Sequence, residues 1–490
     1  MFCSLKYDFQ KGFDMKKGVV EYLKAHAGLD PVWMHMPGHK GSAFFRKYGY
    51  GDFLDIMVDG DITEITGADD KFHADGIIKE TIDMYTSLYE VKQSYLLVNG
   101  TSGGIVTSIL TTVPRGKKLI LSRNCHKSVF NALQLAGAEP VYAYPEVISE
   151  YGIAGEVKAS EIKKLLAENP DAEAVILPSP NYYGICSDIK AIADVVHEAG
   201  KVLIVDQAHG AHLKFFSKYG IEGMPKPAEE CGADITINST HKTLATFTQS
   251  AVMNVNSDRI DLETLEDRLQ MIETTSPSYL FMASHDMNAH IIEEHGEEIF
   301  KGWKENLDYF HEEAKKIKGL RMLRPAGLDE TKLNIDMSAY GLTGSMLEEE
   351  LMKYNIFVEL TTGNILMGMT GIGNTKEDMD RLLTALREIS EKKAGEENGL
   401  PIVNGRCESS YPDFGVLELC DIPKKKKKVA IADAAGCICA ASIIPYPPGI
   451  PIVCPGERIT KEIIDYVIRY KGEGHSVYGV TDDMEVTVGV

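Results

Sequence analysis

Between residues 76 and 240, short runs of uniformly apolar residues alternate with amphipathic segments of helical periodicity. We predict strands at 95–98, 118–121, 173–177 and 202–205, and helices at 77–88, 128–136 and 189–198. Strands that are apolar on both faces are typical of a parallel sheet that helices cover on each side. Crossovers in such a sheet are right-handed, and ligands bind at the carboxyl ends of its strands. The alternation therefore predicts an α/β fold and the edge of the sheet at which a site lies.

The length of 490 residues predicts more than one domain. We predict an N-terminal arm and loops at 1–75, a large domain at 76–300, a small α/β domain at 301–392, a polar linker at 393–414 and a last unit at 415–490. Within the small domain, strand-like runs lie at 333–336, 357–360 and 365–369, and helical runs lie at 345–354 and 376–388.

The composition argues against several classes of partner. With 51 basic and 72 acidic residues the net charge is −21, whereas nucleic-acid binding needs a basic surface. The five lysines at 424–428 are predicted to form an exposed, solvated turn. No stretch of 18 uncharged apolar residues is present, so no membrane span is predicted. The nine cysteines lack paired spacing and residues 1–10 lack a signal-peptide core, so we expect a cytoplasmic protein and no metal site.

A lysine and an aspartate at the ends of two apolar runs indicate a cofactor. Lys242 lies in a turn after a run with strand propensity, and Asp206 ends the strand predicted at 202–205, 36 residues upstream (242 − 206). A lysine amine can form a Schiff base with a carbonyl cofactor. A carboxylate beside a pyridine nitrogen keeps that nitrogen protonated, which makes the ring an electron sink. The pair predicts pyridoxal 5'-phosphate as the cofactor, with Lys242 and Asp206 as catalytic residues.

A glycine-rich turn at 99–104 follows the first predicted strand and opens a helix. Glycines let the backbone approach a phosphate, and the N–H groups at a helix start bind its oxygens together with hydroxyl groups. Thr101 and Ser102 supply such hydroxyls, and Ser239 and His241, on either side of the lysine turn, are predicted to complete the phosphate site.

Two histidines lie at strand ends beside these residues. His126 follows the second predicted strand and is suited to stack on an aromatic cofactor, and Ser128 is a plausible N-cap of the next helix. His209 lies three residues after Asp206 and is suited to contact the ring or a substrate carboxylate. A structural hydrogen-bonding role is the alternative for each histidine.

Taken together, these stretches are similar to a known family. The chain resembles the ornithine/lysine/arginine decarboxylases of the fold-type-I pyridoxal phosphate enzymes, in their compact bacterial form. The matching stretches are 36–41 (Met-Pro-Gly-His-Lys-Gly), 99–104, 123–128, 206–212, 239–244, 275–279, 446–451 (Tyr-Pro-Pro-Gly-Ile-Pro) and 455–457 (Pro-Gly-Glu). Larger members carry an N-terminal wing domain, which we do not expect here. The resemblance implies a mainly parallel, seven-stranded large domain, a small α/β domain and a C-terminal subdomain.

The resemblance also implies a role for individual residues. Lys242 would be the Schiff-base lysine and Asp206 the pyridinium partner, with His126 stacked on the ring and His209 beside it. The phosphate would be held by Thr101, Ser102, Gly103, Ser239 and His241. Thr275 or Ser276 would reach the cofactor site of a partner subunit, so a homodimer or higher homo-oligomer is expected. Glu457, on the last unit, would lie near the distal cation of the substrate.

The function expected from these residues is α-decarboxylation of a basic amino acid, with arginine slightly favoured over lysine and ornithine. One alternative is another reaction on the same fold, such as transamination or a lyase reaction, because a fold does not fix chemistry. Aminotransferases of this fold usually hold the substrate carboxylate with an arginine of the small domain, and residues 355–370 contain none. The second alternative is a non-catalytic regulatory relative, against which the intact set of Lys242, Asp206 and His126 argues.

Overall fold

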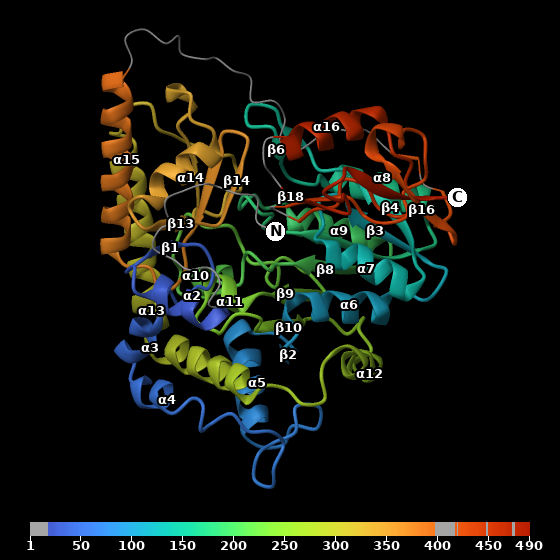
Figure 1. Cartoon of the computed structure of the whole chain (residues 1–490). Coiled ribbons are helices and arrows are strands. Elements are labelled where there is room, and N and C mark those ends of the chain that lie inside the picture. The colour runs from blue at the N-terminus through green and yellow to red at the C-terminus, as the bar shows by residue number, and fades with distance from the viewer. Residues whose placement is uncertain (1–17, 397–416, 419, 447–448, 473–475) are drawn as a thin grey trace.

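A seven-stranded sheet forms the centre of the large domain (Figure 1). The structure is a computed structural model that describes residues 18–396, 417–418, 420–446, 449–472 and 476–490. In spatial order the strands are β2 (Gln93–Leu97), β10 (Ala251–Val255), β9 (Ile235–Asn238), β8 (Val202–Asp206), β7 (Ala172–Pro178), β3 (Lys118–Ser122) and β4 (Glu139–Ala143). Only β10 within this sheet runs antiparallel to its neighbours. The mainly parallel, seven-stranded α/β fold is thus confirmed.

Helices cover both faces of this sheet because its strands are apolar on both faces. In β8, Ile204 packs into one buried cluster, whereas Leu203 and Val205 pack into another on the opposite face. The first cluster includes α6 (Gly100–Thr112), α7 (Lys127–Ala136) and α12 (Leu262–Ile272), and the second includes α8 (Ala159–Glu168) and α9 (Ile189–Glu198). Further elements of this domain are α5 (Ile77–Tyr89), α10 (Leu213–Lys218), α11 (Thr240–Thr243), β5 (Val147–Ile148) and β6 (Ile153–Ala154).

A continuous helix joins the large domain to the small one. α13 (Tyr279–Ala314) runs through residue 300, where we predicted a domain boundary. The small domain has a four-stranded antiparallel sheet in the order β11 (Arg321–Met322), β12 (Lys332–Asp336), β15 (Ile365–Met369) and β14 (Leu360–Thr362). It also contains η2 (Ser338–Tyr340), α14 (Gly344–Met352) and α15 (Lys376–Glu396). The run predicted as one strand at 357–360 is divided between β13 (Ile356–Val358) and β14.

The N-terminal segment belongs structurally to the small domain. β1 (Val32–Met34) pairs in parallel with β13, and α2 (Gly18–Ala27) precedes it. The region 31–75, which we predicted as loops, also forms α3 (Ser42–Lys47) and α4 (Gly51–Asp55). The sequence gives little signal for these elements because they are only three to six residues long.

The C-terminal unit has a hydrophobic core of its own, built around Val453, Ile463 and Val467. Its elements are β16 (Lys426–Ala430), η3 (Ile431–Asp433), β17 (Ile444–Tyr446), α16 (Lys461–Gly472), β18 (Ser476–Tyr478) and β19 (Glu485–Gly489). The lysine run is exposed as predicted, but it enters strand β16, which pairs with β19, and so is not a turn. Most of the predicted linker lies outside the described residues, and its first residues continue α15. Among the described helices none is long and apolar enough to cross a bilayer.

Candidate active site

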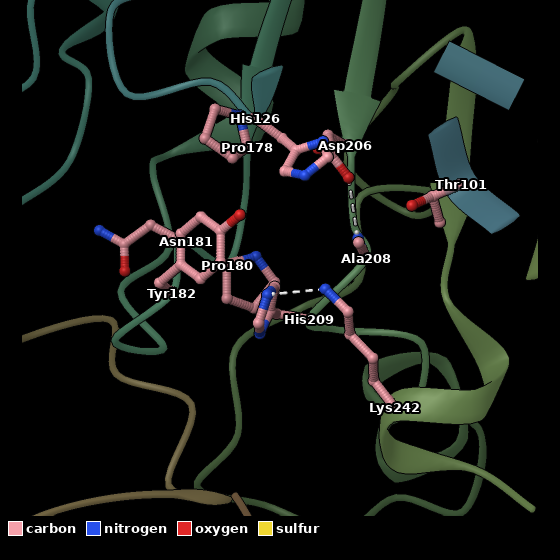
Figure 2. Close-up of a pocket in the computed structure, with 10 residues that line it drawn as sticks. All are labelled: Thr101, His126, Pro178, Pro180, Asn181, Tyr182, Asp206, Ala208, His209 and Lys242. Atoms are coloured by element: carbon pink, nitrogen blue, oxygen red, sulfur yellow. Dashed lines mark hydrogen bonds between the residues drawn. The ribbon is translucent and has the colours of Figure 1, made fainter. Parts of the chain in front are cut away.

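The carboxyl ends of the parallel strands form a pocket that contains the predicted catalytic residues (Figure 2). Thr101 lies near the start of α6 after β2, Asp206 ends β8, and Lys242 lies in α11 after β9. His126 and His209 complete the set. Further residues that line the pocket are Pro178, Pro180, Asn181, Tyr182 and Ala208. The structure therefore brings together, at one edge of the sheet, side chains that lie up to 141 residues apart in sequence (242 − 101).

Lys242 projects into this pocket from the short helix α11. Its ammonium nitrogen lies 2.9 Å from His209 Nε2 (Figure 2). Burial lowers the pKa of Lys242 from its usual value, while the charges of Asp206 and Glu359 act in the opposite direction. A lowered pKa provides more of the free amine, which is the form that attacks a carbonyl carbon.

Asp206 is a buried carboxylate at the end of β8. Its Oδ1 accepts a hydrogen bond of 3.2 Å from the N–H of Ala208, within the turn after the strand. Burial raises the pKa of Asp206, and the positive charge of Lys242 opposes this effect. A cationic group bound in the pocket would stabilise the charged form of this carboxylate, because a buried carboxylate without a positive partner is unfavourable.

His126 has the structural hydrogen-bonding role that we gave as its alternative, and it also lines the pocket, while its stacking on a cofactor stays a prediction. It is the N-cap of α7, because its Nδ1 accepts a hydrogen bond of 3.3 Å from the Ser128 N–H. The N-cap is thus His126, and our assignment of Ser128 to that position is wrong. Burial lowers the pKa of His126 to about 4, so the ring that lines the pocket is neutral at pH 7.

A second cavity of about 250 Å³ adjoins the first and extends to the small domain. Its lining includes three predicted phosphate-binding residues besides Thr101, namely Ser102, Ser239 and His241. His241 Nδ1 lies 2.8 Å from the carbonyl oxygen of Ser250, to which it donates a hydrogen bond, so the ring is fixed in one orientation. The free N–H groups of the first turn of α6 lie beside these hydroxyl groups, as an anion site requires.

Gly103 does not line either cavity, although we predicted that it binds phosphate. A Cβ at Gly103 would lie 2.6 Å from Oε1 of Glu273, so a glycine is required here by a close contact behind the phosphate turn. Glu273 accepts a hydrogen bond of 2.9 Å from the N–H of Val98 and lies 3.6 Å from the buried ammonium of Lys71. No pattern in the sequence indicates that Glu273 is buried. Its hydrogen bond to Val98 stabilises the backbone just before the phosphate turn.

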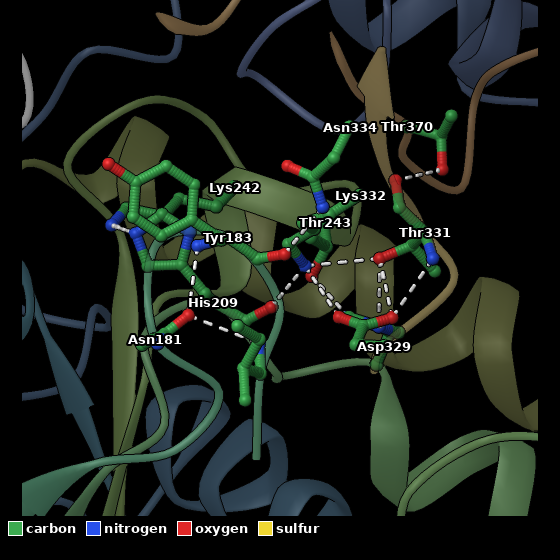
Figure 3. Close-up of polar contacts among 12 residues, drawn as sticks. Asn181, Tyr183, His209, Lys242, Thr243, Asp329, Thr331, Lys332, Asn334 and Thr370 are labelled. Carbon is green, nitrogen blue, oxygen red and sulfur yellow. Dashed lines mark hydrogen bonds and ion pairs between the residues drawn. The ribbon is translucent and has the colours of Figure 1, made fainter. Parts of the chain in front are cut away.

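A buried polar network behind the lysine turn joins the two domains (Figure 3). His212 Nε2 lies 3.1 Å from Asp329, and its Nδ1 lies 3.1 Å from Oγ1 of Thr243, the residue after Lys242. Lys332 donates a hydrogen bond of 2.7 Å to Asp329 Oδ2. Burial alone would raise the pKa of Asp329, but the ammonium of Lys332 and the hydrogen bond with His212 hold it well below its usual value. This network supports the lysine turn and was not predicted.

Three residues that sequence reasoning missed also line the site. Tyr182 lines both cavities, and its ring centroid lies 4.8 Å from that of His209. Glu359 and Met36 come from the small domain and the N-terminal segment. Tyr182 follows the Pro-Ser-Pro sequence after the strand predicted at 173–177, to which we gave no function, and Met36 lies in the matching stretch 36–41. Glu359 had no signal beyond its charge.

Besides Gly103, three predicted residues do not line the pocket of their own chain. Thr275 and Ser276 are exposed in the segment between α12 and α13. Glu457 is fully buried between the C-terminal unit and the large domain, where its Oε2 lies 3.1 Å from the guanidinium of Arg123 and accepts a hydrogen bond of 2.6 Å from Cys454 N–H. Its contact with the distal cation of a substrate therefore has no support in a single chain and stays a prediction.

The fold and the site together define a class of protein. The structure is similar to that of the lysine decarboxylase LdcF of Francisella novicida, with a TM-score of 0.74 and 22% identity, covering 92% of this chain and 78% of that one. The fold is that of the fold-type-I pyridoxal phosphate enzymes. No cluster of three or more metal-ligating side chains lies in the part of the chain that is described.

Comparison of sequences then gives the family. The family model "Orn/Lys/Arg decarboxylase, major domain" matches residues 18–334, and the model of the C-terminal domain matches residues 421–485. The chain belongs to the Orn/Lys/Arg decarboxylase family. It is 31% identical to the arginine decarboxylase of Bacillus subtilis (strain 168) over 94% of both chains. It is 32% identical to the arginine decarboxylase of Halalkalibacterium halodurans, over 95% of this chain and 96% of that relative.

Proposed function

We propose that this chain is a pyridoxal 5'-phosphate-dependent α-decarboxylase of a basic amino acid, with arginine as the favoured substrate. The observation that carries the proposal is the convergence of Lys242, Asp206 and His126 on one pocket at the carboxyl ends of the strands. The arginine specificity is supported by two relatives of similar length that are named arginine decarboxylases.

The side chains of the pocket fit this cofactor. The first turn of α6 and the hydroxyls of Thr101, Ser102 and Ser239 form an anion site, to which His241 adds a ring nitrogen. Asp206 is buried and suited to a cationic ring nitrogen at the opposite end of the site. Thr275 or Ser276 of a second subunit would add to the phosphate contacts. Among the residues that the structure describes, none forms a hydrogen bond with the buried His209 Nδ1, so this nitrogen is available to a bound group.

When bound, the cofactor supplies a protonated pyridine ring that accepts the electron pair left on Cα as carbon dioxide departs. Asp206 keeps the proton on the ring nitrogen, because its carboxylate stabilises the positive charge there. His126, whose own ring is neutral at pH 7, would stack on the cofactor and help to hold it in place. Tyr182, Pro178 and Pro180 add apolar surface to the pocket wall beside these groups.

Lys242 and His209 are the groups that can move a proton near Cα. Their nitrogen atoms lie 2.9 Å apart, and burial lowers the pKa of both residues. Lys242 Nζ would bond with the cofactor and, when released from it, would be the amine available to deliver a proton to Cα of the substrate. His209 Nε2 can accept a hydrogen bond from the same ammonium and so orient it.

The experiment that tests the proposal is an assay of carbon dioxide release from arginine, lysine and ornithine with the cofactor-loaded protein. Release from one of these amino acids, with the corresponding amine as product, is expected, with arginine giving the highest kcat/KM. Formation of a keto acid without carbon dioxide would favour an aminotransferase instead. No turnover with any of the three would contradict the proposal.

We also propose that the enzyme is a cytoplasmic homodimer or higher homo-oligomer. The seven cysteines among the described residues are all free, which supports a reducing compartment. The exposure of Thr275 and Ser276 supports a role toward a partner subunit.

A further inference from the structure

A buried ion pair lies behind the glycine-rich turn that opens α6. The ammonium of Lys71 lies 3.6 Å from Oε2 of Glu273, and both side chains are buried. The same ammonium lies 4.5 Å from the centroid of the Phe72 ring, whose face favours a cation. In the described part of the chain this is the one ion pair that Glu273 forms. Neither Lys71 nor Glu273 lines the two cavities of the site, so the pair acts on the site only through the residues that it contacts.

Glu273 holds the backbone from which the phosphate turn starts. Its two carboxylate oxygens accept hydrogen bonds of 2.9 Å from the Val98 N–H and 3.4 Å from the Asn99 N–H. Asn99 is the N-cap residue of α6, but its side chain donates a hydrogen bond of 2.9 Å to the carbonyl of Ile272 and does not cap the helix. Glu273 therefore fixes the two residues before the helix, while the N–H groups of its first turn stay available to an anion.

The position of this carboxylate creates an electrostatic conflict with a bound phosphate. A Cβ at Gly103, in the first turn of α6, would lie only 2.6 Å from Oε1 of Glu273. A phosphate on this turn and the buried carboxylate behind it have charges of the same sign, which repel each other most strongly where water is excluded. The ammonium of Lys71 offsets the charge of Glu273, so the pair as a whole presents no net charge to the phosphate.

The segment before α5 fixes the backbone that carries Lys71. Oδ2 of Asp69 accepts hydrogen bonds of 2.9 Å from the Gly76 N–H and 3.0 Å from the Ile78 N–H. These bonds close the loop onto the start of α5 and supply the side-chain cap that Gly76, the N-cap residue, lacks. Lys71 is thus presented to Glu273 by a loop with contacts of its own.

We infer that Lys71 is a positioning residue for the cofactor, which sets the affinity for the phosphate group by compensating the charge of Glu273. This inference rests on the proposed function, in which the turn at 99–104 binds the phosphate of pyridoxal 5'-phosphate. Lys71 acts through Glu273 and does not itself touch the cofactor. Because the ammonium is present, the carboxylate can fix the backbone of the turn without repelling the phosphate.

The test compares dissociation constants of pyridoxal 5'-phosphate, measured by absorbance titration of the cofactor-free full chain. Lys71→Met leaves the charge of Glu273 uncompensated, so the dissociation constant should rise about 10- to 100-fold. The double variant Lys71→Met/Glu273→Gln removes both charges and should bind within about threefold of wild type. Pyridoxal, which lacks the phosphate, should bind equally to all three proteins. The matched control is Lys92→Met, which removes an exposed pair with Asp258 and changes the net charge equally, and it should bind as wild type does.

Other results would overturn the inference. Unchanged affinity of Lys71→Met would remove its role, and a double variant that binds as weakly as Lys71→Met would show that packing matters and charge balance does not. Glu273→Gln retains an oxygen for the Val98 N–H and leaves the ammonium in place, so it should bind the cofactor at least as tightly as wild type. Binding about tenfold weaker would contradict this. If Lys71→Met does not fold, the double variant and Glu273→Gln decide, because neither contains an unpaired buried carboxylate.

Inorganic phosphate separates this inference from the proposed function. Calorimetry with phosphate and the cofactor-free protein should give a dissociation constant at least about tenfold higher for Lys71→Met than for wild type. If wild type decarboxylates no basic amino acid but Lys71→Met weakens phosphate binding, the function fails and the role of Lys71 stands. If wild type decarboxylates arginine and Lys71→Met binds both phosphate and cofactor as wild type does, the role of Lys71 fails and the function stands.

Discussion

The ammonium of Lys332, on the small domain, donates a hydrogen bond of 2.5 Å to the backbone carbonyl of His209, on the loop beside Lys242 (Figure 3). Both Lys332 and its ion-pair partner Asp329 are fully buried. The position of His209 therefore depends on a charge supplied by the other domain. Such a pair is costly to break, because removing one member leaves the other charged and unpaired in a medium of low polarity.

The variant Lys332→Met should lower the free energy of unfolding by about 3–5 kcal/mol, since Asp329 loses its buried ammonium partner. Urea unfolding monitored by circular dichroism measures this change. The control is Lys190→Met, which removes an exposed pair with Asp194 and should change stability by less than about 1 kcal/mol. Equal effects of the two variants would mean that the buried network does not stabilise the domain junction.

The variant Lys242→Ala should lose turnover and the visible absorption band of the bound cofactor, because no other described amine lines the site to bond with its carbonyl carbon. Absorbance spectra after gel filtration, together with borohydride reduction and mass spectrometry, provide the measurement. A reducible protein–cofactor adduct in normal yield would show that a different lysine forms the bond.

The variant Asp206→Asn should retain the cofactor but lose activity by roughly 100-fold or more, because a neutral amide cannot keep the ring nitrogen protonated. Cofactor content by absorbance and kcat at saturating substrate separate binding from chemistry. An activity close to that of wild type would remove Asp206 from its proposed role.

His285 should make the protein sensitive to acid. The side chain is fully buried against the Tyr85 hydroxyl, and burial lowers its pKa from the usual value of 6.5 to about 3. Between these two values the unfolded chain binds more protons than the folded one, so stability falls as the pH falls from about 6.5 toward 3. From pH 7 to pH 5 this residue should contribute a loss of about 2 kcal/mol, which His285→Leu should remove. Urea unfolding of both proteins at the two pH values tests this, and equal losses would contradict it.

The active enzyme should sediment with at least twice the 54.0 kDa mass of one chain, because Thr275 or Ser276 is expected to complete the cofactor site of a neighbour. Analytical ultracentrifugation under assay conditions measures this mass. Full activity at the mass of one chain would exclude a shared site.

Most strands of the central sheet, and the catalytic residues at their ends, were predictable because they have a local signal. The runs that became β3, β7 and β8 are continuous apolar stretches, and Asp206 and Lys242 follow such runs directly. β4 was missed because it contains Pro140 and lies at the edge of the sheet, where its side chains are only partly buried. β10 runs antiparallel to β9 after the segment 239–250, which contains only the four-residue helix α11 and not the long crossover helix that our prediction of a parallel sheet assumed.

The rest of the site depends on contacts between distant segments, for which the sequence has no local pattern. Glu273 accepts a hydrogen bond from the N–H of Val98, just before the phosphate turn, and Asp329 is hydrogen-bonded to His212 beside the lysine turn. In the sequence, each of these residues resembles an ordinary surface carboxylate. For Glu457, in contrast, the sequence indicated that the residue matters but not what it contacts. Its motif was recognised, but the structure pairs it with Arg123, a partner that no spacing indicates.

The pairing of β1 with β13 also affects how the protein forms as it is synthesised. Val32 pairs with Ile356, a separation of 324 residues (356 − 32), so the N-terminal strand has no partner until most of the chain exists. At translation rates of 5–20 residues per second, this wait lasts roughly 16 to 65 s. The large domain can fold during that time, whereas the wall that carries Met36 and Glu359 is assembled only afterwards. A chain released by a ribosome that stalls before residue 356 would therefore have a folded central sheet and an unpaired strand at residues 32–34, which makes it a target for chaperones rather than a partly active enzyme.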